Sequence, residues 1–473
     1  MKSCMLCVAK PARARYSPLM QTRTFRITTS PQERPQVEAL LEAQGFAFTP
    51  EPYYPAARRL ECEPFPLGSS LAAGFGLIYI QDRSSMLPPA LLGAAEGDVC
   101  LDMCASPGGK TGILAGEVGR TGFVLAAEAS RDRLATLRQN LRRVGALTAA
   151  TIGVESQHLD LAPGCFDAIL LDPPCSGWGT VDKNPKVLDL WTPEKAEILV
   201  RLQQELFARA AELLRPGGRL MFSTCTTNVR ENEEQAAWAL ATRPLELDPL
   251  PDPKGFARVP LALPGLDGVL RVGGQDKGDD TADAGGQGFF LARFRKRVDS
   301  NTTTAPTGET YPPLGGRELG AKDFAQARDA GVDFSRLPPG EVREFGGKAY
   351  FLHQAALDLC ARSGLGSGGQ RWQGFLLGQV QGGRFVPAAR TRALMPPVQD
   401  LPASCKLDVD EPAIILDLLA GRSLEAPGGP IAKAAGGKGR AAQDTVGMVG
   451  LYFRGLALGW LTRKGRRLLW SDR

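Results

Sequence analysis

The chain has 473 residues, of which 43% are hydrophobic and 23% are charged, a size and composition that suit two or three globular domains. The longest apolar run near the start, 71–80, is about half as long as a bilayer span, and the first thirty residues lack the apolar core of a signal peptide. We therefore expect a cytoplasmic protein without a membrane partner.

Cysteines and histidines limit the chemistry that the chain can use. Ten cysteines are too sparse for a disulfide scaffold, and the only histidines are His158 and His353. Cys4 and Cys7 have the spacing of metal ligands, but no second pair or nearby histidine completes a zinc site, so we expect free thiols and no bound metal. Catalysis then has to depend on cysteines and carboxylates.

The net charge of +5 is unevenly distributed. Residues 1–34 contain seven Lys or Arg and one acid, and residues 449–473 contain six basic residues, one acid and interleaved Tyr, Phe and Trp. Basic and aromatic groups together suit the phosphates and unstacked bases of nucleic acids, although a solvated surface that only aids solubility has the same composition.

Strand and helix patterns alternate from about residue 98. Apolar runs predict five strands, at 98–105, 122–130, 148–154, 166–172 and 219–225. Helices are predicted between them, at 111–119, 131–146 and 192–218, the last beginning at a Thr cap and stopping at Pro-Gly-Gly. Because continuous apolar strands that alternate with helices form a mostly parallel sheet covered on both faces, we predict an α/β, doubly wound, Rossmann-like fold.

Composition also predicts the domain boundaries. The polar, Thr/Pro-rich stretch near 298–313 is typical of a linker, and the Gly/Ala-rich stretch 425–444 is typical of a disordered loop. We expect four parts: an N-terminal substrate-binding region at 1–90, a catalytic domain at 91–297, a linker at 298–315 and a C-terminal domain at 316–473.

The stretch DMCASPGGKT, 102–111, ends like a phosphate-binding loop. Cys104 stands where that loop needs its first glycine, however, and Pro107 interrupts the curl. Small residues after the first strand still let a ligand approach the backbone, and Glu128 at the end of the second strand can accept both hydroxyls of a ribose, unless it only caps the chain beside Ser130. A site that binds a ribose but has no phosphate-binding loop indicates S-adenosylmethionine as the cofactor.

Two cysteines follow neighbouring strands of the predicted sheet. Asp172 and Cys175 come after the fourth strand and Cys225 after the fifth, and adjacent strands lie about 4.8 Å apart. Two thiols beside a methyl donor suit carbon 5 of cytosine, because a thiolate that adds to carbon 6 makes carbon 5 nucleophilic and a second thiol can assist release. Asp172 would reach the ring nitrogen. The alternative is that both cysteines are small core residues, and the residues alone leave open which thiol attacks.

Several ordered motifs between 79 and 297 resemble the Nop/Sun family of RNA (cytosine-5-)-methyltransferases, which are class I S-adenosylmethionine enzymes. The motifs are IQDRSSMLPPALL, LDMCASPGGKT, FDAILLDPPCSGWGTV, LLRPGG, STCTTNVRENEEQ and GFFLARF. The resemblance implies that Cys225 is the nucleophile, that Cys175 helps to free the product, and that Asp172 lies between cofactor and base. It also implies a cofactor site made of Cys104, Ala105, Ser106, Pro107, Gly108, Gly109, Lys110, Glu128 and Asp172.

The chain departs from the family pattern at two places. Pro173 replaces the alanine of the usual DAPC, a change that a rigid loop tolerates. The acid expected to contact adenine after the third strand is less clear, with Glu155 as the first candidate and Asp160 as the alternative.

The region after the linker resembles the RNA-binding appendage of bacterial family members that act on small-subunit ribosomal RNA. RFVPAA and GLALGWLTRKGRRL carry this resemblance, which implies a mixed α/β, PUA-like domain. We expect a monomer whose partner is RNA, with ribosomal RNA favoured over transfer RNA. The predicted contacts to RNA phosphates are Arg463, Lys464, Arg466 and Arg467.

Two other functions remain possible from the sequence. DPPC at 172–175 is similar to the [DN]PP[YFW] loop of amino-group methyltransferases, but those stack the substrate on an aromatic where this chain has Cys175. A non-catalytic RNA-binding or ribosome-assembly protein could also keep this fold, yet it would not need Cys175 together with Cys225.

Overall fold

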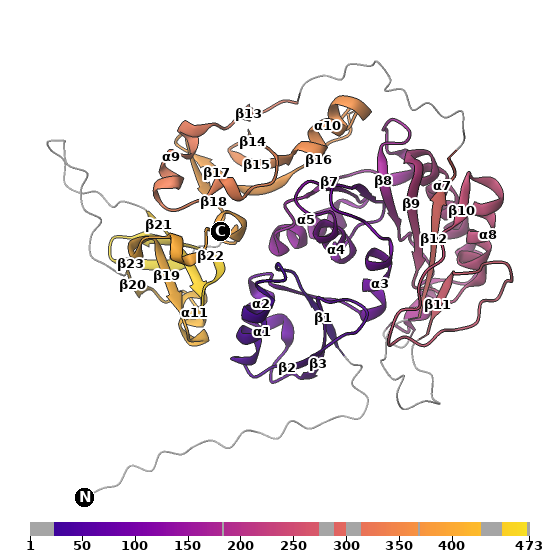
Figure 1. Cartoon of the computed structure of the whole chain (residues 1–473), viewed down its shortest axis with the longest axis horizontal. Helices are drawn as coiled ribbons and strands as arrows, with labels where there is room; N and C mark the ends of the chain where they lie inside the picture. The colour runs from indigo at the N-terminus through magenta and orange to yellow at the C-terminus, as the bar shows by residue number, and fades with distance from the viewer. Residues whose placement is uncertain are drawn as a thin grey trace, which may run out of the picture.

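The computed structural model describes residues 23–181, 184–273, 288–298, 314–367, 369–426 and 447–470 (Figure 1). The Cys4/Cys7 pair lies outside these residues, as do most of the basic N-terminal stretch, of the predicted linker and of the predicted Gly/Ala-rich loop. In the described part of the chain, no helix is both long and apolar enough to cross a membrane.

A sheet of nine strands forms the centre of the described structure. Its order is β10-β12-β9-β8-β5-β6-β7-β16, and β11 pairs with β12. The bounds are β5 Val99–Asp102, β6 Phe123–Ala127, β7 Ala149–Ile152, β8 Phe166–Leu171, β9 Leu214–Thr224, β10 Leu245–Leu247, β11 Leu270–Val272, β12 Phe289–Lys296 and β16 Trp372–Gln373. The five strands β5 to β9 run parallel to one another, and β12 and β16 are antiparallel to β9 and β7 at the two sides, so the predicted doubly wound, Rossmann-like fold is confirmed.

Helices cover both faces of this sheet (Figure 1). They are α3 Arg83–Leu91, α4 Gly109–Glu117, α5 Arg131–Val144, α7 Pro193–Leu213 and α8 Glu233–Thr242. The short helix α6, Val187–Leu190, precedes α7. The apolar stripe of α5 is buried as its spacing predicts, and Ser130 caps the N-terminus of the helix. Thr192 caps α7 as predicted, but α7 ends at Leu213 and the following Pro-Gly-Gly already belongs to β9.

Three smaller sheets surround the central one. The N-terminal sheet has the order β2-β3-β1-β4, and two C-terminal sheets have the orders β13-β14-β15-β17-β18 and β19-β21-β22-β23-β20. The N-terminal elements are β1 Thr24–Ile27, α1 Arg34–Glu42, β2 Ala47–Pro50, β3 Ala57–Cys62, α2 Leu71–Gly74 and β4 Ile78–Ile80. The C-terminal elements are β13 Arg317–Glu318, α9 Ala321–Asp329, β14 Gly340–Phe345, β15 Lys348–His353, α10 Gln354–Ser363, β17 Phe375–Gln381, β18 Arg384–Pro387, β19 Lys406–Val409, α11 Pro412–Leu419, β20 Leu424–Glu425, β21 Gly447–Phe453, β22 Leu456–Lys464 and β23 Arg467–Trp470.

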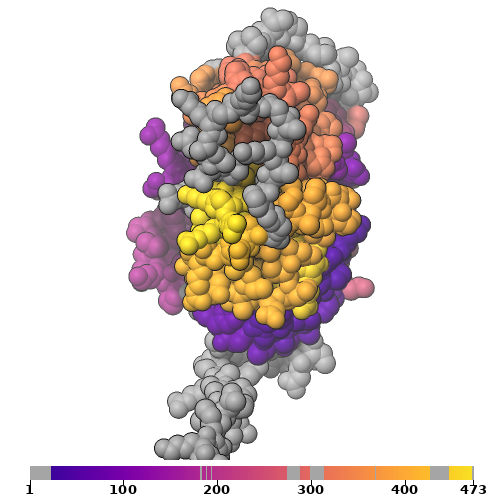
Figure 2. Space-filling view, turned by 90° about the vertical axis from the view of Figure 1, so that its left-hand side faces the viewer, coloured from indigo at the N-terminus to yellow at the C-terminus, as the bar shows by residue number. Residues whose placement is uncertain are grey.

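The C-terminal region packs tightly on the rest of the chain. One hydrophobic cluster contains buried residues from both the N-terminal region and the last C-terminal sheet, and Figure 2 shows these two parts in contact. The half-buried Arg392 donates hydrogen bonds to the carbonyl oxygens of Phe75, Gly76 and Val144. Since β16 also extends the central sheet beside β7, the parts share cores, and the exact domain boundaries stay a prediction.

Candidate active site

The two cysteines meet at the carboxyl edge of the central sheet. Cys175 follows β8 and Cys225 follows β9, and these strands are parallel neighbours in the sheet. The two Sγ atoms lie 3.4 Å apart, and both side chains are half-buried. The structure therefore brings together the two thiols that the sequence predicts would face one substrate.

The thiol pair is electrostatically asymmetric. A hydrogen bond from Cys175 lowers the pKa of Cys225, and the positive charge of Lys110 lowers it further, while burial and the nearby Asp172 act in the opposite direction. The same hydrogen bond, together with burial, raises the pKa of Cys175 well above its usual value. Because the thiolate is the nucleophilic form, Cys225 is the better nucleophile of the two.

Asp172 is held beside the thiols from two sides. Its Oδ2 lies 2.6 Å from Lys110 Nζ, and its Oδ1 accepts a hydrogen bond of 2.7 Å from Ser223 Oγ. Lys110 also lies over the ring of Phe289, 5.4 Å from its centroid. Lys110 thus orients Asp172 and lowers the pKa of Cys225. The sequence interpretation grouped Lys110 with the cofactor loop. The sequence interpretation did not identify Ser223, although it belongs to the quoted motif STCTTN.

A buried carboxylate connects the loops that carry the two cysteines. Glu231 has no exposed surface, and it accepts hydrogen bonds from the backbone N–H and the Oγ of Ser176, from Gln203 and from Asn228. Ser176 Oγ donates its only proton to Glu231, so in the hydrogen bond of 2.6 Å between Ser176 Oγ and Thr226 Oγ1 the threonine is the donor. Ser176 follows Cys175 and Thr226 follows Cys225, so Glu231 supports both thiols.

Sequence reasoning did not identify Glu231 either. Its place in the motif NVRENEEQ was the only available signal, because a glutamate in a polar stretch is usually exposed. Glu231 is buried because α7, which contributes Gln203, packs against the loop that follows β9.

A cavity of about 180 Å³ lies over the ends of β5, β6 and β7, and Pro174, the residue before Cys175, is part of its wall. Glu128, Glu155 and Cys104 line it, and so do the apolar side chains Val154, Leu202 and Leu206. The Glu128 carboxylate is 4% exposed; its Oε1 accepts a hydrogen bond from Ser130 N and its Oε2 lies 3.4 Å from Arg133. Glu128 therefore lines the cavity, as a ribose acceptor would, and its carboxylate also caps the backbone at Ser130. The structure is compatible with both sequence-based interpretations of this residue.

The predicted cofactor residues divide into those at the cavity and those behind it. Cys104 lines the cavity, but Ser106 Oγ donates to the Arg133 carbonyl and Asn140 donates to the Pro107 carbonyl, so this part of the loop lies against α5. Ala105 N donates to the Ala127 carbonyl. Gly108, with φ of 103°, and Gly109, where a Cβ would meet Tyr79 and Gln81 at 3.0 Å, allow the close turn into α4. Of the two candidate adenine contacts, Glu155 lines the cavity and Asp160 does not.

The predicted C-terminal RNA contacts are corrected in part. Arg463 is 4% exposed and donates to the Gly465 carbonyl, so its prediction as a surface contact is wrong. Lys464, Arg466 and Arg467 are exposed and stay predicted contacts.

The expectation that C-terminal aromatics meet unstacked bases is wrong for three of the four, and Trp470 is half-buried. Tyr452, Phe453 and Trp460 are buried in hydrophobic clusters, and Trp470 packs edge-on against Phe75 with the ring centroids 5.3 Å apart. In the N-terminal stretch, the buried Arg26 donates to the Gly109 carbonyl rather than facing solvent. The side chains followed the apolar periodicity of their strands, which the composition of the segment does not reveal.

In the described ranges, no three His, Cys, Asp or Glu side chains are grouped as metal ligands would be. Cys4 and Cys7 lie outside those ranges, and their role stays a prediction.

Residues 89–258 match the family model described as 16S rRNA methyltransferase RsmB/F. The chain is 38% identical over 318 residues to proteins named ribosomal RNA small subunit methyltransferase F from Salmonella agona and Salmonella heidelberg. Each match covers 65% of this chain and 64% of the relative, so the chain matches somewhat less than two thirds of the length of these relatives.

Solved structures show the same fold. A methyltransferase homolog protein from Pyrococcus horikoshii is 32% identical, with a TM-score of 0.50, and the match covers 59% of this chain and 88% of that chain. NSun6 from Pyrococcus horikoshii has a TM-score of 0.51 at 22% identity over 59% of this chain and 91% of that chain, which supports the fold alone. The central domain of this chain therefore matches the RsmB/F family over residues 89–258, and its motifs resemble the Nop/Sun type.

Proposed function

We propose that this protein is an S-adenosylmethionine-dependent RNA (cytosine-5-)-methyltransferase that forms 5-methylcytosine in small-subunit ribosomal RNA, with transfer RNA as the less favoured substrate. The observation that carries the proposal is the pair of sulfur atoms 3.4 Å apart beside Asp172, with Cys175 on a loop whose Pro174 also lines the cavity with Glu128. The family match and the names of the Salmonella relatives support the choice of ribosomal RNA.

The residues at the cavity fit S-adenosylmethionine. Glu128 offers a buried carboxylate for ribose hydroxyls, and Val154, Leu202 and Leu206 offer apolar walls that suit adenine. Cys104 would contribute to the same site, and Glu155 is the acid at its edge. When bound, this cofactor supplies an electrophilic methyl group.

The chain's own residues account for activation of the base. The Cys225 thiolate forms a bond to carbon 6 of cytosine, and the electron pair of the ring double bond moves onto carbon 5, which becomes nucleophilic. Asp172, held by Lys110 and Ser223, is placed to interact with the edge of the ring.

Product release reverses this addition. Once carbon 5 carries the methyl group, a base, either water or the Cys175 sulfur, takes the carbon-5 proton. The electron pair of that C–H bond re-forms the ring double bond, and the bond from Cys225 sulfur to carbon 6 breaks with its electron pair on sulfur. This step regenerates the Cys225 thiolate. Cys175 lies 3.4 Å from that sulfur, and we assign it to assist the release.

RNA that contains 5-fluorocytosine tests the proposal. Fluorine does not leave as a cation, so a carbon-5 enzyme stays covalently attached and migrates as an adduct on a denaturing gel. We expect an adduct with wild type and S-adenosylmethionine and none with Cys225→Ala, while Cys175→Ala accumulates an adduct even on ordinary RNA. An adduct that persists in Cys225→Ala would reverse the roles, and its absence in wild type would favour an amino-group methyltransferase or a non-catalytic RNA-binding protein. Bisulfite mapping of RNA from a deletion strain then identifies the target.

A further inference from the structure

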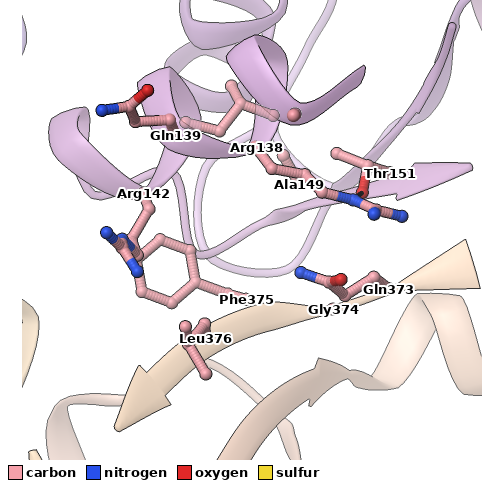
Figure 3. Close-up of a pocket in the computed structure, with 11 residues that line it drawn as sticks. Arg138, Gln139, Arg142, Ala149, Thr151, Gln373, Gly374, Phe375 and Leu376 are labelled. Atoms are coloured by element: carbon pink, nitrogen blue, oxygen red, sulfur yellow. Dashed lines mark hydrogen bonds between the residues drawn. The ribbon is translucent and has the colours of Figure 1, made fainter. Parts of the chain in front are cut away.

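A groove runs between α5 and the C-terminal strands β16 to β18, away from the thiols. It consists of two adjoining hollows, of about 360 and about 500 Å³, that share Gln139 and Arg142. Figure 3 shows the first hollow, with Arg138 and Arg142 on α5 above residues 373–376, where β16 ends and β17 begins. We call the two hollows together the α5 groove.

The α5 groove carries positive charge without acidic residues. Arg138 and Arg142 line the first hollow, and Arg142, Arg143 and Arg390 line the second, whereas no Asp or Glu lines either. Among the ion pairs of the described residues, none includes Arg138, Arg142 or Arg143. Arg133, on the same helix, is by contrast paired with Glu128.

Hydrogen bonds hold two of these arginines, Arg138 and Arg143, in place. Arg138 Nε donates to Thr151 Oγ1 at 2.9 Å, and Arg143 donates to Asn140 Oδ1 at 2.7 Å. Arg138 and Arg142 lie four positions apart on one face of α5, about 6 Å along its axis, so each can meet a separate phosphate. Arg143 is one position further on. The amides of Gln139 and Gln373 add neutral donors to the same groove.

We propose that the α5 groove binds backbone phosphates of the substrate RNA, as a contact surface separate from the target-base site and from Lys464, Arg466 and Arg467. The guanidinium groups of Arg138, Arg142 and Arg143, which form no ion pair within the described residues, match phosphates because they offer paired donors and a permanent charge. The helix connects this surface to the active site, since α5 begins directly after Glu128 and Arg133 lines the cofactor cavity. The identification of the polyanion as RNA rests on the proposed function.

Binding of fluorescent substrate RNA, measured by anisotropy across a salt series with S-adenosylhomocysteine present, tests this inference. Arg142→Gln/Arg143→Gln changes two exposed residues on the full chain, and Arg138→Gln is the second variant. We expect at least tenfold weaker RNA binding for the double variant and a salt dependence of log K shallower by about one to two. Cofactor affinity should not change. The matched control is Arg422→Gln, an exposed arginine paired with Asp417 beyond α11.

RNA affinities of the double variant and of Arg138→Gln within twofold of the Arg422→Gln control would overturn the inference. A poly-glutamate peptide that competes with RNA at equal charge concentration would also overturn it, in favour of an acidic protein partner. Because this assay requires no methyl transfer, its result is independent of the proposed activity. Wild type that binds RNA through the α5 groove but forms no 5-fluorocytosine adduct would refute the activity and leave the groove in place.

Discussion

The carboxylate that supports both cysteine loops is open to a quantitative test with Glu231→Gln. Glu231 Oε1 accepts from Ser176 Oγ and Asn228, and Oε2 accepts from Ser176 N and Gln203. Whichever way the new amide is oriented, two of these four donors face an NH₂ group instead of an oxygen. At about 1–3 kcal/mol for each unsatisfied buried donor, the variant should lose about 2–6 kcal/mol of stability.

Catalysis should suffer separately from stability. The network positions Ser176 and Thr226, which are the residues next to the two cysteines, so its loss loosens both sulfur atoms. A displacement of about 1 Å can cost about 10²-fold in rate, and we expect a decrease of that order in the rate of adduct formation on 5-fluorocytosine RNA. Urea unfolding and single-turnover adduct formation at a temperature where the variant is folded measure the two effects. Cofactor affinity should stay within a few-fold of wild type.

A buried carboxylate elsewhere provides the control. Glu51 is 3% exposed and pairs with Arg59 and Arg83, in contacts that do not include the cysteine loops. Glu51→Gln should lower stability while the adduct rate of the folded protein is unchanged. If Glu231→Gln formed the adduct as fast as Glu51→Gln, our reasoning that Glu231 positions the thiols would be refuted.

Two further predictions follow from charges around the site. Lys110→Met should raise the pKa of Cys225 and Asp172→Asn should lower it, because the two charges act on the Cys225 thiolate with opposite signs. The pH dependence of Cys225 alkylation by iodoacetamide, followed by peptide mass analysis, measures both pKa shifts. Shifts of the same sign in the two variants would contradict the assignment. Burial raises the pKa of Asp102 to about 6, so the folded state binds its proton more tightly than the unfolded chain does. The free energy of unfolding should fall by up to about 3 kcal/mol as the pH rises from about 4 to about 6, and Asp102→Asn should remove this contribution. Urea unfolding of wild type and variant at about pH 4.5 and about pH 7 measures it. An equal pH dependence in the two proteins would show that the reasoning is wrong.

Local patterns in the sequence determined the central fold and the main chemical groups. The apolar stripe of α5 and the continuous apolar runs of β6 and β8 depend on nearest neighbours along the chain, so periodicity alone predicts them. Cys175 and Cys225 were predictable for the same reason. Each lies within four residues after a recognisable strand, and adjacent parallel strands end at one edge of the sheet.

Tertiary structure alone decided which polar groups support the site and which charges face solvent. Glu231 looked like one of several acids, and it is buried because α7 and the loop after β9 enclose it. Arg463 looked like its basic neighbours, yet it is buried within the C-terminal sheet. The α5 groove needs two segments more than two hundred residues apart in sequence. Burial and charge pairing are sums over contacts between distant segments, and such sums cannot be obtained from the order of residues in either segment.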